Sequence, residues 1–178
     1  LLSDIKIGSI YSGIFSEANS QTKASLMLVI SLPNAKDELS VLMVHSNQDL
    51  DEDRWIVNLY PTDVDGYAYE ENMAIILSEQ TFVHFKTLKN PQGQLQPEKC
   101  KEILKKNIFR QTEIYYQTIH QPVQQQPFLP GDSLIPYSGR VFDQNEMINL
   151  VDSSLDFWLT TGPYTERFER AFAKRVGV

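Results

Sequence analysis

Short β-rich runs separated by polar turns make up the first half of the chain. The runs cover residues 7–14, 25–31, 39–46, 54–59, 73–77 and 81–88. The segments between them are rich in Asn, Asp, Pro and Gly, which bond to their own backbone or tolerate turn geometry. Several short strands at this spacing predict a small twisted barrel or sandwich.

The hydrophobic period changes after Gly93. Pro97 stands where the first turn of a helix accepts proline, and apolar residues then recur at helical spacing to about Thr118. Residues 117–131 contain five Gln and three Pro, a composition that favours an extended connector over a packed element. The sequence therefore predicts a helix followed by a linker.

Two amphipathic helices are predicted near the end of the chain. Asp143 followed by Glu146 is typical of a capping box, and a second helix is predicted from near Pro163 to Gly177. Each helix has an apolar stripe, and no third layer in the sequence covers both stripes. We therefore expect these helices to form no closed core, with the missing layer downstream.

Together these patterns predict an α+β chain in four parts. Residues 1–97 form the barrel, 98–119 a helix, 120–134 a Gln/Pro-rich linker and 135–178 a helical segment. The apolar content of 42% is enough to build a core. The chain begins with Leu and ends just after a helix-like segment, so we expect it to be a fragment of a longer protein.

The composition indicates the cellular compartment and excludes several kinds of functional site. No apolar run approaches the roughly 20 residues of a membrane span, and the single Cys100 cannot form an internal disulfide, which indicates a reducing cytoplasm. Paired-cysteine, nucleotide-loop and His-Glu-x-x-His motifs are absent from the sequence. The acidic run 49–53 lacks the central glycine of a calcium loop. No metal site is predicted.

Charge is divided unevenly along the chain. Residues 1–97 carry 13 acids and 6 bases, a net charge of −7, whereas residues 98–178 carry 10 of each. A nucleic-acid binder gains affinity by neutralising phosphates with Lys and Arg. The acidic first part therefore disfavours nucleic acid as a partner.

Three runs in the C-terminal part carry a specific pattern. They are Ile-Pro-Tyr-Ser-Gly-Arg-Val-Phe at 135–142, Ser-Leu-Asp-Phe-Trp-Leu-Thr at 154–160 and Phe-Glu-Arg-Ala-Phe-Ala-Lys at 168–174. With them, residues 126–178 resemble the N-terminus of the DegT/DnrJ/StrS family of PLP-dependent sugar enzymes, closest to the CDP-4-keto-6-deoxyglucose 3-dehydratase branch. The resemblance can be extended back to about residue 103, because that branch also opens with a helix bearing two tyrosines.

This resemblance implies a parent enzyme of deoxysugar biosynthesis for lipopolysaccharide or O-antigen. The parent would have the fold-type-I aminotransferase architecture, bind PLP and a sugar nucleotide, and form a homodimer. The family's phosphate-binding turn, its aspartate at the pyridine nitrogen and its Schiff-base lysine (a histidine in the dehydratase branch) have no counterparts here. We therefore expect this chain to bind no cofactor and to be silent in that reaction.

The same resemblance points to a substrate loop. The residues that match the loop approaching the sugar nucleotide are Trp158, Thr160, Thr161, Gly162 and Tyr164. Threonine hydroxyls and free backbone N–H groups suit sugar or phosphate oxygens, and a tyrosine can stack or donate. The local pattern also fits a packing role, because Trp158 and Tyr164 fall on the apolar stripes of two helices.

The N-terminal part shows a second resemblance. It is carried by the runs Gly8–Tyr11, Leu26–Ser31, Val41–Val44, Ser78–Leu88 and Gly93–Glu98. In order and spacing, residues 5–108 resemble the MazF/PemK barrel, the endoribonuclease toxin of bacterial toxin–antitoxin pairs. That family has an Arg-Pro pair before its second strand, where this chain has Ser25-Leu26.

Cleavage of RNA through its 2′-hydroxyl needs a base and a cation near the phosphate. Lys23, His45 and Ser46 are the residues nearest to those roles, and an imidazole can titrate near neutral pH. The missing arginine and the negative field argue against activity. The alternative to the sugar-enzyme interpretation is therefore a degenerate toxin relative that binds RNA or a partner protein.

Overall fold

A computed structural model gives the structure of the chain. It describes residues 5–16, 22–46, 55–66, 72–84, 88–135, 137–139 and 141–178. The chain divides into two units, Leu1–Asn107 and Ile108–Val178. The acidic run at 49–53 lies outside the described residues. The division into units falls inside the helix that follows the sheet.

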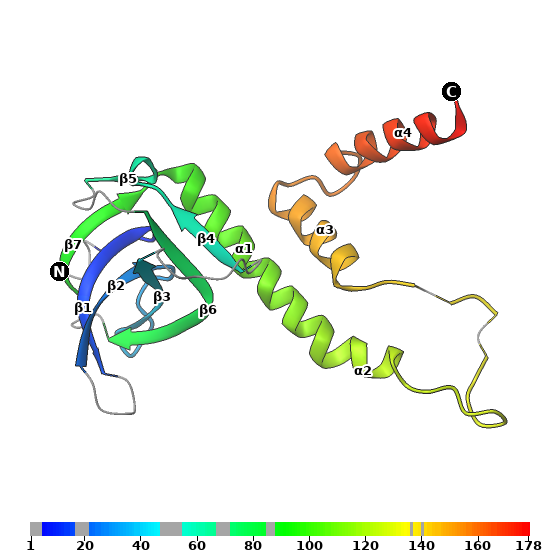
Figure 1. Cartoon of the computed structure of the whole chain (residues 1–178), viewed down its shortest axis with the longest axis horizontal. Coiled ribbons are helices and arrows are strands. Elements are labelled where there is room, and N and C mark those ends of the chain that lie inside the picture. Colours follow the sequence, from blue (N-terminus) through cyan, green and yellow to red (C-terminus); the bar gives the residue numbers. More distant parts are fainter. Residues whose placement is uncertain are drawn as a thin grey trace. The chain divides into compact units, whose positions relative to one another are not determined.

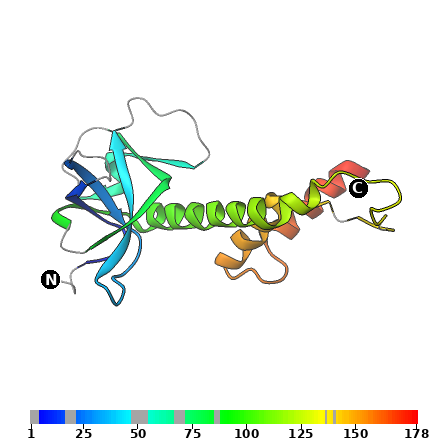
Figure 2. The same ribbon diagram turned by 90° about the horizontal axis from the view of Figure 1, so that it is seen from below.

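The first unit is built on one antiparallel sheet. Its strands are β1 (Ser9–Ser16), β2 (Thr22–Val29), β3 (Glu38–Ser46), β4 (Ile56–Leu59), β5 (Val64–Asp65), β6 (Met73–His84) and β7 (Leu88–Leu95). They lie in the order β4-β6-β3-β2-β1-β7-β5. Figures 1 and 2 show this sheet curled into an open barrel. The predicted α+β class with a barrel-like sheet is confirmed at this level.

The central strands bury both of their faces. On β2, Leu28 is packed in one hydrophobic cluster and Met27 in the other, and Leu42 and Val41 divide in the same way on β3. All four are at most 1% exposed. Because a strand buried on both faces needs no polar alternate positions, these strands appear in the sequence as nearly continuous apolar runs.

Two of the predicted strands are one. Residues 73–77 and 81–88 were predicted as separate runs, but β6 continues from Met73 to His84. Its polar middle pairs with β3 through a register shift between Leu42 and Val44, and Gln80 accepts a hydrogen bond from Asn107 at 3.2 Å. The bulge and the hydrogen bond from Asn107 thus allow β6 to continue through polar residues that the sequence pattern had separated into two runs.

The last strand, β7, was not predicted. The predicted runs end at residue 88, yet Leu88–Leu95 pairs with β1, with Tyr11 opposite Pro91 and Ile10 opposite Gly93. The register shifts on both sides of Tyr11. Since β5 pairs only with Gln94 and Leu95, Pro91 lies where β7 is an edge strand, a position that tolerates proline.

A continuous helical segment follows the sheet. It consists of α1 (Pro97–Tyr115), a π-helical turn η4 (Tyr116–His120) and α2 (Gln121–Gln124), and Figure 2 shows the ribbon running through all three. The helix was predicted to end at residue 119, so the connector begins later than expected. Pro122 lies in α2 directly after the π-helical turn, where its missing N–H removes one bond to the preceding turn.

The two predicted C-terminal helices are present and start at the predicted residues, but the first of them ends at Leu155, before Trp158, which the helical spacing had included. Helix α3 (Gln144–Leu155) has the capping box, in which the Asp143 carboxylate accepts from the Asn145 N–H at 2.7 Å and the Glu146 carboxylate accepts from the Asp143 N–H at 2.8 Å. Helix α4 (Pro163–Val176) ends at Gly177, whose φ of 79° is left-handed. Neither helix has a buried residue.

Candidate functional site

The loop between α3 and α4 is a well-defined turn. The Phe157 N–H donates to Ser154 O at 3.0 Å, and the Trp158 N–H donates to Ser153 O at 2.9 Å. Phe157 has a φ of 60°, so the helix ends in the Schellman arrangement with a left-handed residue. The Ser153 hydroxyl also donates to Trp158 O at 2.6 Å. These bonds fix the position of Trp158 relative to α3.

Trp158 packs over Gly162. A Cβ built on Gly162 would lie 3.0 Å from three atoms of the Trp158 side chain, a contact so tight that the tryptophan would have to shift. Gly162 is buried, whereas Trp158 remains 50% exposed. The glycine is therefore needed for this packing, and half of the tryptophan surface stays available to solvent.

Thr160 and Thr161 lie on the exposed side of the same loop. Neither hydroxyl has a hydrogen-bond partner within the part of the chain that the structure describes. A hydroxyl can both donate to and accept from a sugar or phosphate oxygen. These two residues have the exposure that the predicted substrate contact requires.

Tyr164 is held between the two helices. Its phenolic hydroxyl donates to Asp152 Oδ2 at 2.8 Å and lies 3.2 Å from Asn149 Oδ1. The guanidinium carbon of Arg167 lies 4.2 Å from the centre of the tyrosine ring. Burial and the hydrogen bond to Asp152 raise the pKa of Tyr164, while Arg167 opposes the rise. The hydroxyl is thus neutral and engaged within the hairpin.

The loop residues therefore divide into two groups. Trp158, Gly162 and Tyr164 take the packing role that the helical stripes suggested, and Thr160 and Thr161 face solvent. The sequence analysis missed Asp152, whose carboxylate anchors the tyrosine. The signal was the i, i+3 spacing of Asn149 and Asp152, which places both on one face of α3. Ligand contact by this loop remains a prediction.

The residues considered for ribonuclease chemistry lie on neighbouring strands. Lys23 is on β2 opposite Phe15, and His45 and Ser46 are on β3 opposite Ala74 and Met73. His45 is partly buried. The side chains of Lys23 and Ser46 lie outside the described residues. Their catalytic roles remain predictions.

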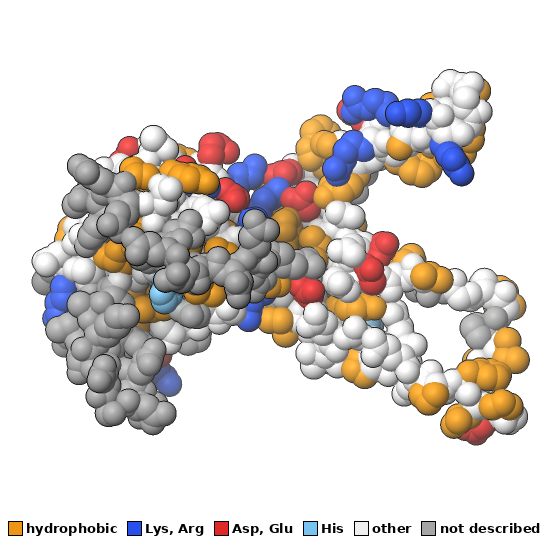
Figure 3. All heavy atoms as spheres, in the orientation of Figure 1, with side chains coloured by type: hydrophobic (Ala, Val, Ile, Leu, Met, Phe, Trp, Pro, Cys, Tyr) orange, Lys and Arg blue, Asp and Glu red, His pale blue; other side chains and the backbone are white. Residues whose placement is uncertain are grey.

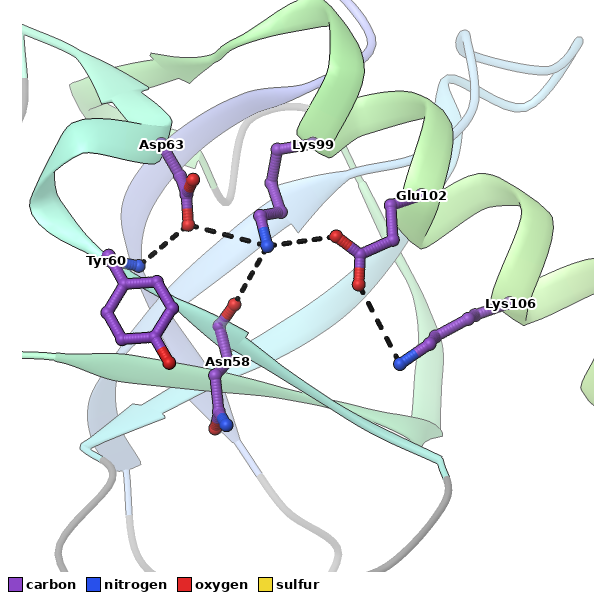
Figure 4. A network of polar contacts seen from close by, with 6 residues as sticks. All are labelled: Asn58, Tyr60, Asp63, Lys99, Glu102 and Lys106. Atoms are coloured by element: carbon purple, nitrogen blue, oxygen red, sulfur yellow. Dashed lines mark hydrogen bonds and ion pairs between the residues drawn. The ribbon is translucent and has the colours of Figure 1, made fainter.

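A polar network that the sequence analysis did not identify holds the start of α1 (Figure 4). Lys99 Nζ lies 2.9 Å from Glu102 Oε2 and 3.5 Å from Asp63 Oδ2, and it donates to Asn58 O at 3.3 Å. Asp63 also accepts from the Tyr60 N–H at 2.9 Å. Burial lowers the pKa of Lys99, but Glu102 and Asp63 together outweigh that effect and raise it.

This network has a structural role. Asn58 belongs to β4, Asp63 to the short helix η2 (Pro61–Asp63) and Lys99 to the first turn of α1. The ammonium group therefore ties the edge of the sheet to the helix that packs on it through Ile103. Its charges are satisfied within the protein.

Within the described ranges, no group of three His, Cys, Asp or Glu side chains is arranged to hold a metal ion. In the same ranges, no helix is both long enough and apolar enough to cross a bilayer.

Fold and loop together define a chain with a curled antiparallel β unit followed by helices that expose their apolar faces. No protein-family model matches it. Over 67 residues it is 34% identical to the lipopolysaccharide biosynthesis protein RfbH of Salmonella typhimurium strain LT2, covering 38% of this chain and 15% of RfbH. The chain thus spans about 15% of the length of this curated relative.

One solved structure to which the chain shows some similarity is an endoribonuclease in complex with its cognate antitoxin from a mycobacterial species. The similarity covers 57% of this chain and 91% of that one, at 14% sequence identity and a TM-score of 0.40.

Proposed function

We propose that residues 135–178 are the N-terminal helical segment of a PLP-dependent sugar-nucleotide 3-dehydratase or aminotransferase of deoxysugar biosynthesis. The identity with RfbH, a lipopolysaccharide biosynthesis protein, is the observation that carries this proposal. The presence of two helices in this segment, α3 and α4, is consistent with the proposal. The β unit would then precede the enzyme in the same polypeptide.

The residues of the C-terminal unit do not fit PLP. The cofactor works as an electron sink only when its phosphate, its ring nitrogen and a Schiff-base group are fixed together. Lys174 is the one lysine in the sequence between residues 108 and 178, and it is exposed on α4. We infer that PLP is bound by other segments of the parent and that this chain has no catalytic step of its own in that reaction.

In the parent, the α3–α4 loop would contact the sugar nucleotide. Thr160 and Thr161 would offer hydroxyls, and the exposed half of Trp158 would offer an aromatic surface for a sugar or base. Gly162 and Tyr164 would hold the loop in place, because their own contacts lie within the hairpin.

A chimera tests this proposal. Residues 135–178 would replace the matching segment of RfbH in a Salmonella strain that lacks RfbH, and lipopolysaccharide would be measured. We expect the chimera to restore synthesis, and we expect the double change Thr160→Ala and Thr161→Ala to reduce it. Ser138→Ala, at another exposed hydroxyl, is the matched control. A chimera that accumulates as soluble protein and restores nothing would contradict the proposal.

The genomic DNA gives an independent test. An in-frame continuation beyond the codon for Val178, carrying a phosphate-binding turn and the Schiff-base position, would support the enzyme parent. A stop codon at that point would contradict it and leave the β unit as the functional part.

The alternative is a degenerate MazF/PemK-like relative that binds RNA or a partner protein. The observation in its favour is that β2 and β3 are neighbours, which brings the strands of Lys23 and His45 together. Cleavage of RNA by the purified chain is its direct test.

A further inference from the structure

The loop between α3 and α4 is held chiefly by hydrogen bonds. Phe157, Trp158 and Leu159 are 88%, 50% and 73% exposed, and Figure 3 shows hydrophobic side chains at the surface where α3 is followed by α4. An apolar side chain that stays in water contributes little to fixing its own backbone, because the hydrophobic effect acts on surface that is buried. The conformation of this loop therefore depends mainly on the polar contacts at its two ends.

Two neighbouring residues of α3 make these contacts. The Asp152 carboxylate accepts from the Tyr164 hydroxyl at 2.8 Å, where the loop ends. Ser153 is joined to Trp158, where the loop begins, by two hydrogen bonds. Its carbonyl accepts from the Trp158 N–H at 2.9 Å, and its hydroxyl donates to the Trp158 carbonyl at 2.6 Å. Both backbone groups of Trp158 thus have the same partner residue.

This double contact sets the direction of the chain after Trp158. The bond from the Trp158 N–H completes the end of the helix, but by itself it leaves the next peptide plane free to rotate. The Ser153 hydroxyl removes that freedom, because it holds the carbonyl of that plane. The Trp158 ring then packs over Gly162, and Thr160 and Thr161 face solvent.

We propose that Ser153 is a positioning residue for the substrate loop. Through Trp158 it holds the tryptophan ring and the two threonine hydroxyls in the arrangement that receives the sugar nucleotide. The hydroxyl proton of Ser153 is already donated to the Trp158 carbonyl, so the serine acts through the tryptophan and not on the substrate. This inference rests on the proposed function of residues 135–178.

Ser154 is the matched control for Ser153. Its hydroxyl donates to the Leu150 carbonyl at 2.8 Å, one turn earlier in the same helix. A serine that bonds back to its own helix in this way makes no contact with the loop that follows. Replacement of either serine by alanine removes the same atom from the last turns of α3, but only Ser153→Ala removes a bond to the loop.

Fluorescence of Trp158 tests the positioning in the full chain. In a Trp55→Phe background, Ser153→Ala should shift the Trp158 emission to longer wavelength and increase its quenching by acrylamide, because the ring is no longer held over Gly162. Ser154→Ala should change neither quantity, and Ser153→Thr, which keeps a hydroxyl, should restore both. The same emission and quenching in the two alanine variants would overturn the proposal.

The purified RfbH chimera tests the link to substrate, with CDP-4-keto-6-deoxyglucose as the probe. Ser153→Ala should raise its KM about fivefold, the equivalent of one neutral hydrogen bond, and leave kcat nearly unchanged, because the loop binds substrate and takes no part in bond breaking. Ser154→Ala should alter neither constant. Equal effects of the two serine variants, or a lower kcat at unchanged KM, would overturn the substrate role.

The two experiments fail in different ways. An unmodified chimera without activity would contradict the proposed function, and the substrate role of Ser153 with it. The fluorescence of the full chain does not depend on that activity, so it still decides whether Ser153 positions Trp158.

Discussion

The hydroxyl of Tyr164 lies 2.8 Å from a carboxylate oxygen of Asp152, so the first turn of α4 is tied to the last turns of α3 by a charge-assisted hydrogen bond. Because neither helix has a buried residue, such contacts carry a large share of what holds the hairpin together. The tyrosine that the resemblance assigned to a ligand thus has a partner within its own chain.

Tyr164→Phe tests that tie. Removing the hydroxyl leaves the Asp152 carboxylate without this donor, and we expect the hairpin to lose about 1 kcal/mol of stability. Hydrogen exchange should quicken in α3 and α4 and stay unchanged in the β unit. Tyr137→Phe, at a fully exposed tyrosine, is the control and should change neither. Equal exchange in the two variants would show that the bond does not stabilise the hairpin.

The Lys99 network predicts a loss of stability in alkali. The pKa of Lys99 is raised, because Glu102 and Asp63 outweigh the effect of burial. The folded state therefore holds this proton more tightly than the unfolded state. The contribution is complete below the unfolded pKa and is lost as pH rises through the folded pKa.

Lys99→Met isolates this contribution. We expect the difference in unfolding free energy between the natural chain and the variant to stay constant below the ordinary pKa of lysine and to shrink as pH rises above it. Lys36→Met, at an exposed turn lysine, should show no such trend. Burial raises the pKa of Cys100 as well, so both measurements belong in a Cys100→Ala background. A difference that does not depend on pH would contradict the network.

Two isoleucines on α1 make a matched pair. Ile103 is 1% exposed in the main cluster, whereas Ile108 is 40% exposed. Ile103→Ala should lower the unfolding free energy of the β unit by about 3 kcal/mol, and Ile108→Ala by under about 1 kcal/mol. Urea denaturation followed by Trp55 fluorescence, in a Trp158→Phe background, measures both. Similar losses at the two positions would refute the assigned packing of α1.

Phe157 occupies a backbone conformation that suits glycine. Its φ is 60° and its side chain is 88% exposed. We expect Phe157→Gly to stabilise the hairpin by about 1 kcal/mol relative to Phe157→Ala, since only glycine relieves the left-handed strain. Hydrogen exchange of α3 gives the comparison. A less stable glycine variant would show that the turn is not strained.

The ribonuclease alternative makes a direct prediction. If residues 135–178 belong to a sugar enzyme and the β unit lacks the toxin arginine, the purified chain should not cleave a single-stranded RNA. Cleavage that disappears in both Lys23→Met and His45→Gln, and persists in Lys36→Met, would contradict this expectation and establish the alternative.

Local signals in the sequence were sufficient to predict the presence of the two C-terminal helices. The Asp143 and Glu146 capping box and the Pro163 and Gly177 boundaries depend only on residues within one turn of each helix end. The barrel-like class followed from the short apolar runs. Features of this kind are specified by neighbours in the chain, so the sequence displays them directly.

Features that depend on distant partners were missed. Strand β6 continues through its polar central residues because its pairing with β3 shifts register there and because Asn107 donates a hydrogen bond to Gln80. The Lys99 network joins residues that are far apart in sequence and become neighbours only when α1 reaches β4. For the loop, the sequence named the residues, but only the structure separates Tyr164, engaged with Asp152, from the solvent-facing Thr160.

The pairing of β1 with β7 has a consequence for biosynthesis. Ser9 donates a hydrogen bond to Gln94, 85 residues later, so β1 keeps one unpaired edge until that part of the chain has left the ribosome. Exposed strand edges recruit other chains. A nascent chain that stalls or is cut between β6 and the end of β7 would therefore present β1 to its neighbours, and slow translation across residues 85–95 should appear as aggregation of nascent chains.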